Sequence, residues 1–215
     1  MLLRKIYIII FFFCIFFSAN SQTVFNFRLG YLGFHPGRNS NSSLYENSIS
    51  ENGDVVIEPS LWFGLESFIR EDHTSIQFYQ GFLADAAARS AGFSHVGIKR
   101  RLIMRNRLSM FAEIGTTLSY RENWAPLAGY NANADDFKYE GIGKWQTKWI
   151  WVSGGLSWYF YLTKKHDMSF AVWYGHYEKT ITLTLGYRYW FSVIFKHPKP
   201  CKCPFDKYDK KYKRS

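Results

Sequence analysis

The sequence predicts an all-β protein, an eight-stranded antiparallel up-and-down transmembrane β-barrel. Aromatic residues make up 20% of the 215 residues, yet the mean hydropathy is only −0.23. Beyond residue 22 no apolar run reaches the roughly 20 residues that a membrane-spanning helix needs. The chain instead holds segments rich in aromatic and β-branched residues with partial alternation of polar and apolar positions. Strands of a barrel in lipid have this pattern because one face meets lipid and the other lines the lumen.

The first feature along the chain is an expected signal peptide at residues 1–21. Two basic residues, Arg4 and Lys5, precede an apolar run at 6–17, and small residues stand at the −3 and −1 positions of a cleavage site before Gln22. The alternative, an N-terminal membrane anchor, needs a longer apolar run than this one. The mature chain is therefore expected to begin at Gln22 and to be exported.

Residues 22–191 are expected to form one barrel domain. The last strand shows the alternation most clearly, because Ile181, Leu183 and Leu185 share one face while threonines share the other. Aromatic and β-branched residues mark eight such strands, at 23–35, 55–70, 74–83, 92–103, 108–121, 145–162, 168–176 and 180–191.

The connections between these strands alternate in length. Longer connections are expected at 36–54, 84–91 and 122–144, and short turns at 71–73, 104–107 and 163–167, with a last short connection at 177–179. Bacterial outer-membrane barrels have long extracellular loops, short periplasmic turns and an even strand number. We therefore expect an outer-membrane location with both termini in the periplasm. The alternative, a soluble barrel of the lipocalin type, would have to expose a belt of Leu, Ile and Tyr to water or place Glu and Arg inside.

Charged residues fall on the face opposite the apolar one. An eight-stranded barrel is too narrow for an open pore, so these charges are expected to fill the lumen as ion pairs. Lys99 and Glu113 lie at similar depth on adjacent strands and are expected to pair with each other. The predicted lumen network consists of Arg28, Glu66, Lys99, Glu113 and Arg188.

The C-terminal segment 192–215 is expected to be a disordered, basic periplasmic tail. From residue 196 onward eight Lys and Arg stand against two Asp, which gives +6 of the formal +10 charge of the chain. Behind a signal peptide and a barrel this charge does not indicate nucleic acid. A solubilising tail is the first expectation, and binding of anionic lipid or a cell-wall polymer is the alternative. The pair Cys201 and Cys203 supplies half a zinc site at most and forms a strained ring if bridged.

These features resemble the small outer-membrane barrels, including the membrane domain of outer-membrane protein A. The resemblance covers residues 23–191 and includes the aromatic final strand Leu-Gly-Tyr-Arg-Tyr-Trp-Phe at 185–191. It implies that the barrel-assembly machinery reads the final strand, with Phe191 as its terminal aromatic, and that outer-membrane lipid and lipopolysaccharide surround the barrel. In that family the chain often ends at the aromatic, whereas here a tail follows.

A second, weaker resemblance is to the lipid A palmitoyltransferase barrel. The segment Gly-Phe-Leu-Ala-Asp at 81–85 and the segment Tyr-Arg-Glu-Asn-Trp at 120–124 are similar to its motifs, and His35 matches its catalytic histidine. The resemblance implies that His35 acts as general base and that Asp85 orients it. The sequence departs from that family at Ala86, where a serine is expected, and it lacks the helix that precedes the barrel.

A lipid A deacylase is the other enzymatic alternative, with His176 and Glu178 as candidate residues. That enzyme uses a His-x-Ser pair, whereas here Tyr177 and Glu178 follow the histidine. No metal-ligand spacing and no cofactor motif is visible, so no cofactor is expected. The leading hypothesis is a non-catalytic barrel that supports envelope integrity or surface contacts through its extracellular loops. A lipid A acyltransferase or deacylase and a small porin-like pore or transporter are the alternatives.

Overall fold

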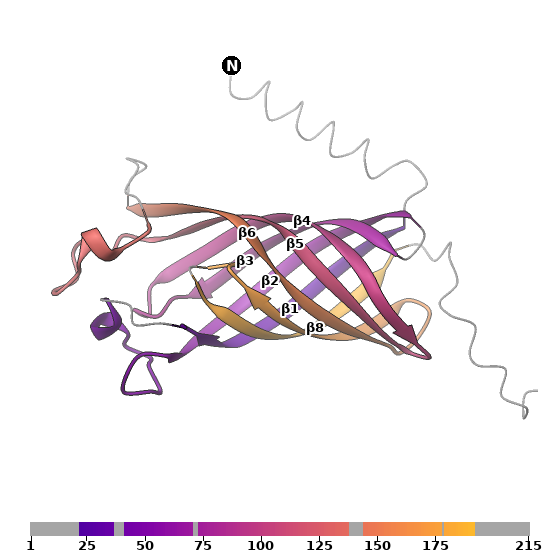
Figure 1. Cartoon of the computed structure of the whole chain (residues 1–215), viewed down its shortest axis with the longest axis horizontal. Coiled ribbons are helices and arrows are strands. Elements are labelled where there is room, and N and C mark those ends of the chain that lie inside the picture. The colour runs from indigo at the N-terminus through magenta and orange to yellow at the C-terminus, as the bar shows by residue number, and fades with distance from the viewer. Residues whose placement is uncertain (1–21, 37–40, 71–72, 138–143, 178, 192–215) are drawn as a thin grey trace, which may run out of the picture.

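The computed structural model describes residues 22–36, 41–70, 73–137, 144–177 and 179–191. These residues form a closed barrel in which every strand pairs antiparallel with the next and β8 pairs with β1 (Figure 1). The strands are β1 Thr23–Phe34, β2 Val55–Arg70, β3 Thr74–Ala84, β4 Ser90–Arg105, β5 Leu108–Glu122, β6 Trp145–Tyr161, β7 His166–Tyr174 and β8 Ile181–Trp190. The predicted fold class is confirmed, and two short 3-10 helices, η1 Ser42–Leu44 and η2 Ala132–Ala134, lie in its loops.

Several expectations concern other parts of the chain. The signal peptide at 1–21, the basic tail at 192–215 with Cys201 and Cys203, and the candidate residue Glu178 lie outside the described residues. The expected roles of these segments remain predictions.

Long and short connections alternate around the barrel. The long connections β1–β2 and β5–β6 gather at one end in Figure 1, which we call the long-loop end. The turns β2–β3, β4–β5 and β6–β7, the start of β1 and the end of β8 lie at the other end, which we call the short-turn end. Among the described residues no helix is long and apolar enough to cross a membrane.

The seventh strand lies two residues earlier than expected. Strand β7 begins at His166, because His166 and Asp167 pair with Tyr189 and Arg188 of β8. It ends at Tyr174, because Gly175 has a φ of 75°, a left-handed conformation that suits glycine and closes the turn. His176 therefore lies in the β7–β8 turn and not in a strand.

Strand β1 contains a bulge that reverses which residues face the lumen. The register shifts between Gly30 and Leu32 against both neighbouring strands. Tyr31 is the extra residue against β8, whereas two residues of β2, Glu58 and Pro59, lie opposite it on the other side. Before the bulge the even-numbered residues, such as Arg28, are buried; after it Gly33 and His35 are buried instead. The bulge thus turns His35 into the barrel.

Side chains fill the lumen in layers. An apolar cluster at the short-turn end holds Phe68, Phe111, Tyr161 and Trp190 among others, and a charged layer lies above it. A second aromatic cluster follows toward the long loops, where Trp62 packs edge-on against Phe93 and Trp173 with ring centroids 4.9 and 5.5 Å apart. Tyr79 and Phe93 lie over Gly64 and Gly81, where any Cβ would overlap the ring.

The outer wall of the barrel is apolar. Large hydrophobic side chains that face outward keep much of their surface exposed, up to 78% for Trp151. They occur on all eight strands and include Leu29, Leu61, Phe82, Ile98, Ile114, Trp149, Phe170 and Leu185. An apolar belt outside a polar lumen is the arrangement of a transmembrane barrel and the reverse of a soluble one.

Candidate functional site

The candidate residues gather beneath the loops at the long-loop end. Tyr45 from the β1–β2 connection, Ala86 and Ala87 from the β3–β4 connection and Trp124 from the β5–β6 connection form one buried cluster with Val56. Leu44, Leu127 and Tyr130 pack against it. The barrel is therefore covered by its own loops at this end.

Asp85 lies under this cover and joins three connections. Its Oδ1 accepts hydrogen bonds from the backbone N–H groups of Ala87 (3.1 Å) and Arg89 (2.8 Å). Its Oδ2 accepts from the indole N–H of Trp124 (2.8 Å) and from the hydroxyl of Tyr177 (3.3 Å). Burial raises the pKa of the Asp85 carboxyl, while the Arg89 and Trp124 donors oppose the rise. All four positions of the carboxylate are occupied within the fold.

His35 pairs with Glu58, a residue that sequence analysis did not single out. The two side chains are 3.2 Å apart between Nε2 and Oε2, and both are almost fully buried. The ring of His35 packs against Tyr45 with centroids 5.2 Å apart, and Gly33 leaves the space that the Glu58 carboxylate occupies. The sequence did hold a signal for Glu58, because the even-numbered residues of β2 face the lumen. The bulge at Tyr31, which turns His35 inward, was not foreseeable.

His176 is buried against aromatic rings in the β7–β8 turn. Its ring lies 4.8 Å from Trp62 and 5.1 Å from Phe93, and its Nε2 is 3.3 Å from the hydroxyl of Thr182. Burial lowers the pKa of His176 to about 3, with smaller contributions in the same direction from His35 and His95. His176 is therefore a neutral side chain near pH 7.

These residues do not form a recognisable catalytic arrangement. No hydrogen bond joins His35, Asp85 and His176 among the described residues, and each has its own structural contacts. The hydroxyl within hydrogen-bond distance of the His176 ring belongs to Thr182, and Ser119 donates its hydroxyl to the His176 carbonyl at 2.8 Å. Acyl transfer requires a nucleophile paired with a base. Among the described residues, a serine hydroxyl lies beside a histidine ring at Ser153, 3.1 Å from Nδ1 of His95, which is buried in the lumen.

Arg121 also holds a long connection in place, although the sequence analysis noted it only within the segment 120–124. Its guanidinium lies between Trp124 and Phe137, 3.7 and 4.2 Å from their ring centroids, and forms an ion pair with Asp135. Its Nε donates to Gln146 at 2.9 Å. The β5–β6 connection therefore folds back over the barrel around one buried cation.

The two longest connections are also fastened to each other. Asn41 donates its side-chain N–H to the carbonyl of Asn131 at 3.2 Å and accepts the Asn131 backbone N–H at 2.8 Å. Within the described residues no group of three or more His, Cys, Asp or Glu side chains could hold a metal ion. The arrangement at this end holds loops in place.

The charged layer lies deeper, in the middle of the lumen. All five residues predicted for it are buried there, but the expected pair of Lys99 and Glu113 is wrong. The two are register partners on β4 and β5. Lys99 Nζ instead lies 2.7 Å from Glu66 on β2. The carboxylate of Glu113 is engaged by other groups, including Arg28 of β1 at 3.1 Å, because long side chains reach across the narrow lumen.

Arg188 has a partner that sequence analysis assigned to a turn. Its Nε lies 2.8 Å from Asp167, and its Nη1 lies 3.8 Å from Glu66. Asp167 also accepts from the indole N–H of Trp190 at 2.6 Å. The earlier start of β7 brings Asp167 into the lumen.

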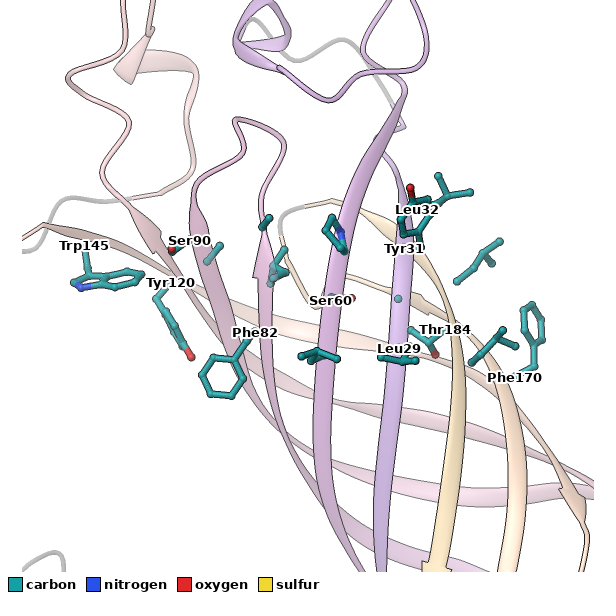
Figure 2. Close-up of a pocket in the computed structure, with 18 residues that line it drawn as sticks. Leu29, Tyr31, Leu32, Ser60, Phe82, Ser90, Tyr120, Trp145, Phe170 and Thr184 are labelled. Atoms are coloured by element: carbon teal, nitrogen blue, oxygen red, sulfur yellow. The ribbon is translucent and has the colours of Figure 1, made fainter.

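A depression of about 1090 Å³ lies in the barrel wall toward the long-loop end (Figure 2). Figure 2 shows Leu29, Phe82, Tyr120, Trp145 and Phe170 spread along it. A polar group borders it on the outer wall, where Gln80 donates to the Tyr120 hydroxyl at 2.6 Å and accepts from Ser94 at 2.7 Å. The apolar lining suits hydrocarbon chains, and the polar atoms of Gln80 are satisfied within the wall.

No protein-family model and no curated protein matches the chain. Solved structures of similar shape include the N-terminal β-barrel domain of Pseudomonas aeruginosa OprF, with 10% identity, a TM-score of 0.47 and coverage of 80% of this chain and 100% of that one. The attachment invasion locus protein Ail of Yersinia pestis has 8% identity, a TM-score of 0.42 and coverage of 80% and 97%. Neisserial surface protein A has 9% identity, a TM-score of 0.42 and coverage of 80% and 98%. These likenesses concern the barrel and carry no argument about activity.

Proposed function

We propose that this protein is a non-catalytic barrel of the bacterial outer membrane whose long loops form a fixed surface for contacts outside the cell. Both termini then lie in the periplasm, at the short-turn end. The barrel supports the envelope as a rigid, filled cylinder, and outer-membrane lipid and lipopolysaccharide surround its wall.

The apolar belt supports the membrane location. Side chains such as Ile98 (53% exposed) and Ile114 (61% exposed) point outward next to Lys99 and Glu113, which are buried in the lumen. Exposing such a belt to water is unfavourable, at about 25 cal/mol for each Å² of apolar surface, whereas lipid accepts it. The alternation therefore favours a bilayer as the surrounding solvent.

The single observation that carries the non-catalytic proposal is the saturated carboxylate of Asp85. A general base needs a lone pair directed at a substrate proton, but the four hydrogen bonds to Asp85 come from Ala87, Arg89, Trp124 and Tyr177. These donors belong to the β3–β4 and β5–β6 connections and the β7–β8 turn. Asp85 thus acts as a staple that fixes the loop surface.

The filled lumen argues for a structural role and against a pore. Buried ion pairs and aromatic rings occupy successive layers of the described lumen, from Trp190 at the short-turn end to Trp62 beneath the loops. Eight-stranded barrels have room for side chains inside and little else.

The test compares membranes from cells with and without the protein. The protein should fractionate with the outer membrane, and the acyl count of lipid A, measured by mass spectrometry, should be the same in both membranes. A changed acyl count would overturn the non-catalytic proposal and direct attention to His35, Asp85 and His176. Recovery of the protein in a soluble fraction would overturn the proposed location.

A matched pair of variants sharpens the test. Asp85→Ala removes the staple, whereas Glu46→Ala changes an exposed acidic residue of the β1–β2 connection. We expect neither variant to alter lipid A, and we expect only Asp85→Ala to make the long loops sensitive to protease added outside cells. Equal loop protection in both variants would contradict the staple.

A further inference from the structure

The short-turn end of the barrel carries a rim of cations. Arg100 near the end of β4, Arg105 and Arg107 at the β4–β5 turn, and Lys165 at the β6–β7 turn are exposed. Among the described residues no carboxylate forms an ion pair with any of these four. We call them the cationic rim.

Hydrogen bonds hold the two turns of this rim against neighbouring strands. The backbone N–H of Tyr161 donates to the carbonyl of Arg107 at 2.9 Å, and that of Trp190 donates to the carbonyl of Lys165 at 3.0 Å. Asn106, between the two arginines of the β4–β5 turn, has a left-handed φ of 53°. The four cations therefore lie on the end of β4 and on two turns whose backbones are bonded to β6 and β8.

The surrounding charges do not neutralise the rim. Asp167, the acidic residue nearest to Lys165 in the chain, is buried and paired with Arg188. In the sequence of the neighbouring segments, Glu71 and Asp72 are acidic and Arg101 and Lys164 are basic, so these four formal charges balance and leave the charge of the rim. The long-loop end is different, because exposed Glu46, Glu51, Asp54 and Asp136 accompany its lysines. Positive charge is thus concentrated at one end.

The rim borders directly on the apolar belt. Leu102, Ile103 and Leu108, which are 51%, 58% and 46% exposed, lie on the same hairpin as its three arginines. Leu162, 43% exposed, precedes the turn that holds Lys165. Long basic side chains at such a border place their apolar stems along hydrocarbon and their charges at head-group level. A soluble anionic polymer would not need this adjoining apolar surface.

We propose that the cationic rim binds the phosphates of anionic phospholipids in the leaflet that faces the short-turn end. This inference rests on the proposed membrane location. It adds a specific lipid class and names the side chains that select it. Each exposed cation near an anionic surface contributes a favourable interaction that falls off within a Debye length, so the selectivity should weaken as salt rises.

The test uses the purified mature chain with its tail, in detergent micelles doped with equal amounts of phosphatidylglycerol and phosphatidylcholine. Native mass spectrometry counts the lipids that remain bound. We expect phosphatidylglycerol to be enriched about tenfold at low salt, the size that one to two kcal/mol of favourable charge interaction would give. If bound phosphatidylglycerol exceeded bound phosphatidylcholine by less than twofold, the proposal would be overturned.

Two charge-matched variants identify the binding surface. One carries Arg100→Gln, Arg105→Gln, Arg107→Gln and Lys165→Gln, and the other carries Arg89→Gln, Lys144→Gln, Lys148→Gln and Lys179→Gln at the long-loop end. Both keep the basic tail, and heat-modified gel migration checks that both are folded. Loss of enrichment in the first variant alone supports the rim. Equal loss in both, or none in the first, would overturn it.

A competition experiment separates a lipid from a polymer. Soluble polyglutamate at equal total charge should leave most of the bound phosphatidylglycerol in place, because it cannot contact the apolar border. Full displacement would overturn the choice of lipid as partner. This binding experiment uses purified protein and does not depend on where the protein lies in cells. Recovery of the protein outside the outer membrane would therefore refute the proposed function but would leave the lipid binding of the rim unaffected.

Discussion

Arg28 on β1 and Glu113 on β5 form an ion pair across the lumen, with 3.1 Å between Nη2 and Oε1. The two strands lie four positions apart in a ring of eight, so the pair joins opposite walls. The same Nη2 donates to the hydroxyl of Tyr159 on β6 at 2.7 Å, and the guanidinium lies 4.7 Å from the ring centroid of Tyr79 on β3. One side chain thus connects four strands of the wall.

Removing one member of this pair should strongly destabilise the barrel. Glu113→Gln leaves the buried charge of Arg28 without its counter-charge, and we expect a loss of about 3–5 kcal/mol in the free energy of unfolding. Denaturant unfolding in micelles, followed by tryptophan fluorescence, measures the loss. The double variant Arg28→Met with Glu113→Gln should lose less than the sum of the two single variants. Additive losses would contradict a direct pair.

Asp85 should stabilise the loop surface through its carboxylate and not through its size. Asp85→Asn keeps one oxygen for the N–H groups of Ala87 and Arg89 but presents an amide N–H to Trp124, so the indole N–H becomes unsatisfied. We expect a local loss of about 1–3 kcal/mol, measured as faster hydrogen exchange in the β5–β6 connection. Trp124→Phe removes the donor as well, and combining the two changes should add little. Unchanged exchange in Asp85→Asn would contradict the staple.

Gly81 should tolerate no side chain because the ring of Phe93 lies over it. Gly81→Val forces the ring away, and we expect about 1–3 kcal/mol of destabilisation from overpacking. The combination Gly81→Val with Phe93→Ala should recover part of this loss, since the new side chain then fills the space of the ring. Thermal unfolding monitored by gel migration compares the variants. A neutral Gly81→Val would show that Phe93 has another position.

The outer wall should distinguish lipid from water. Ile98 is 53% exposed, so Ile98→Lys would be nearly neutral if water surrounded the barrel. In a bilayer we expect a loss of about 2–4 kcal/mol in the free energy of unfolding from lipid vesicles. Glu46→Lys, in the exposed β1–β2 connection, is the control and should change stability by less than about 0.5 kcal/mol. Similar small effects for both substitutions would argue against a lipid-facing wall.

Acid should destabilise the long-loop end through His176. Burial depresses the pKa of His176 to about 3 in the folded protein, so the unfolded chain binds the proton more readily. The stability that neutral His176 contributes is complete above the unfolded pKa of about 6.5 and is lost as the pH falls toward 3. Between pH 7 and pH 4 this amounts to about 3 kcal/mol.

The measurement compares the parent chain with His176→Gln, which cannot take up the proton. Hydrogen exchange of the β7–β8 turn as a function of pH should rise less steeply on acidification in the variant. His35 and His95 lie near the same ring and remain in both proteins, so their own contribution cancels in the comparison. Identical pH profiles would exclude His176 as the residue that titrates.

Strand number and the side-chain faces were readable from the sequence because they depend on a local period of two. Alternation at residues such as Lys99 and Arg188 assigns each side chain to lumen or wall without reference to any other strand. The alternation of loop lengths follows likewise from where the aromatic and β-branched segments are interrupted. Strand ends were less accurate, as at β7, where pairing with β8 extends the strand to His166.

The candidate site was predicted only in part. Asp85, His35 and His176 do lie at the long-loop end, but Glu58 and Thr182 were not singled out, and Trp124 was noted only as the end of the segment 120–124. The bulge at Tyr31 decides the direction of His35, and nothing in the local sequence marks it. The alternation along β5 places Arg121 on the lumen face, as it does Glu113. The contacts of Arg121 with Asp135 and Phe137, however, depend on the path of a long loop.

Which charged side chains pair with each other inside the barrel depends on the closure of the sheet. Lys99 and Glu113 are register partners on the adjacent strands β4 and β5. A prediction that considers only neighbouring strands therefore pairs their charges. Once the sheet closes, the lumen is narrow enough for Lys99 to reach Glu66 on β2 and for Arg28 to reach Glu113 on the opposite wall. Period and composition act along the chain and are visible in it, whereas distances across a closed sheet exist only after all eight strands have taken their register.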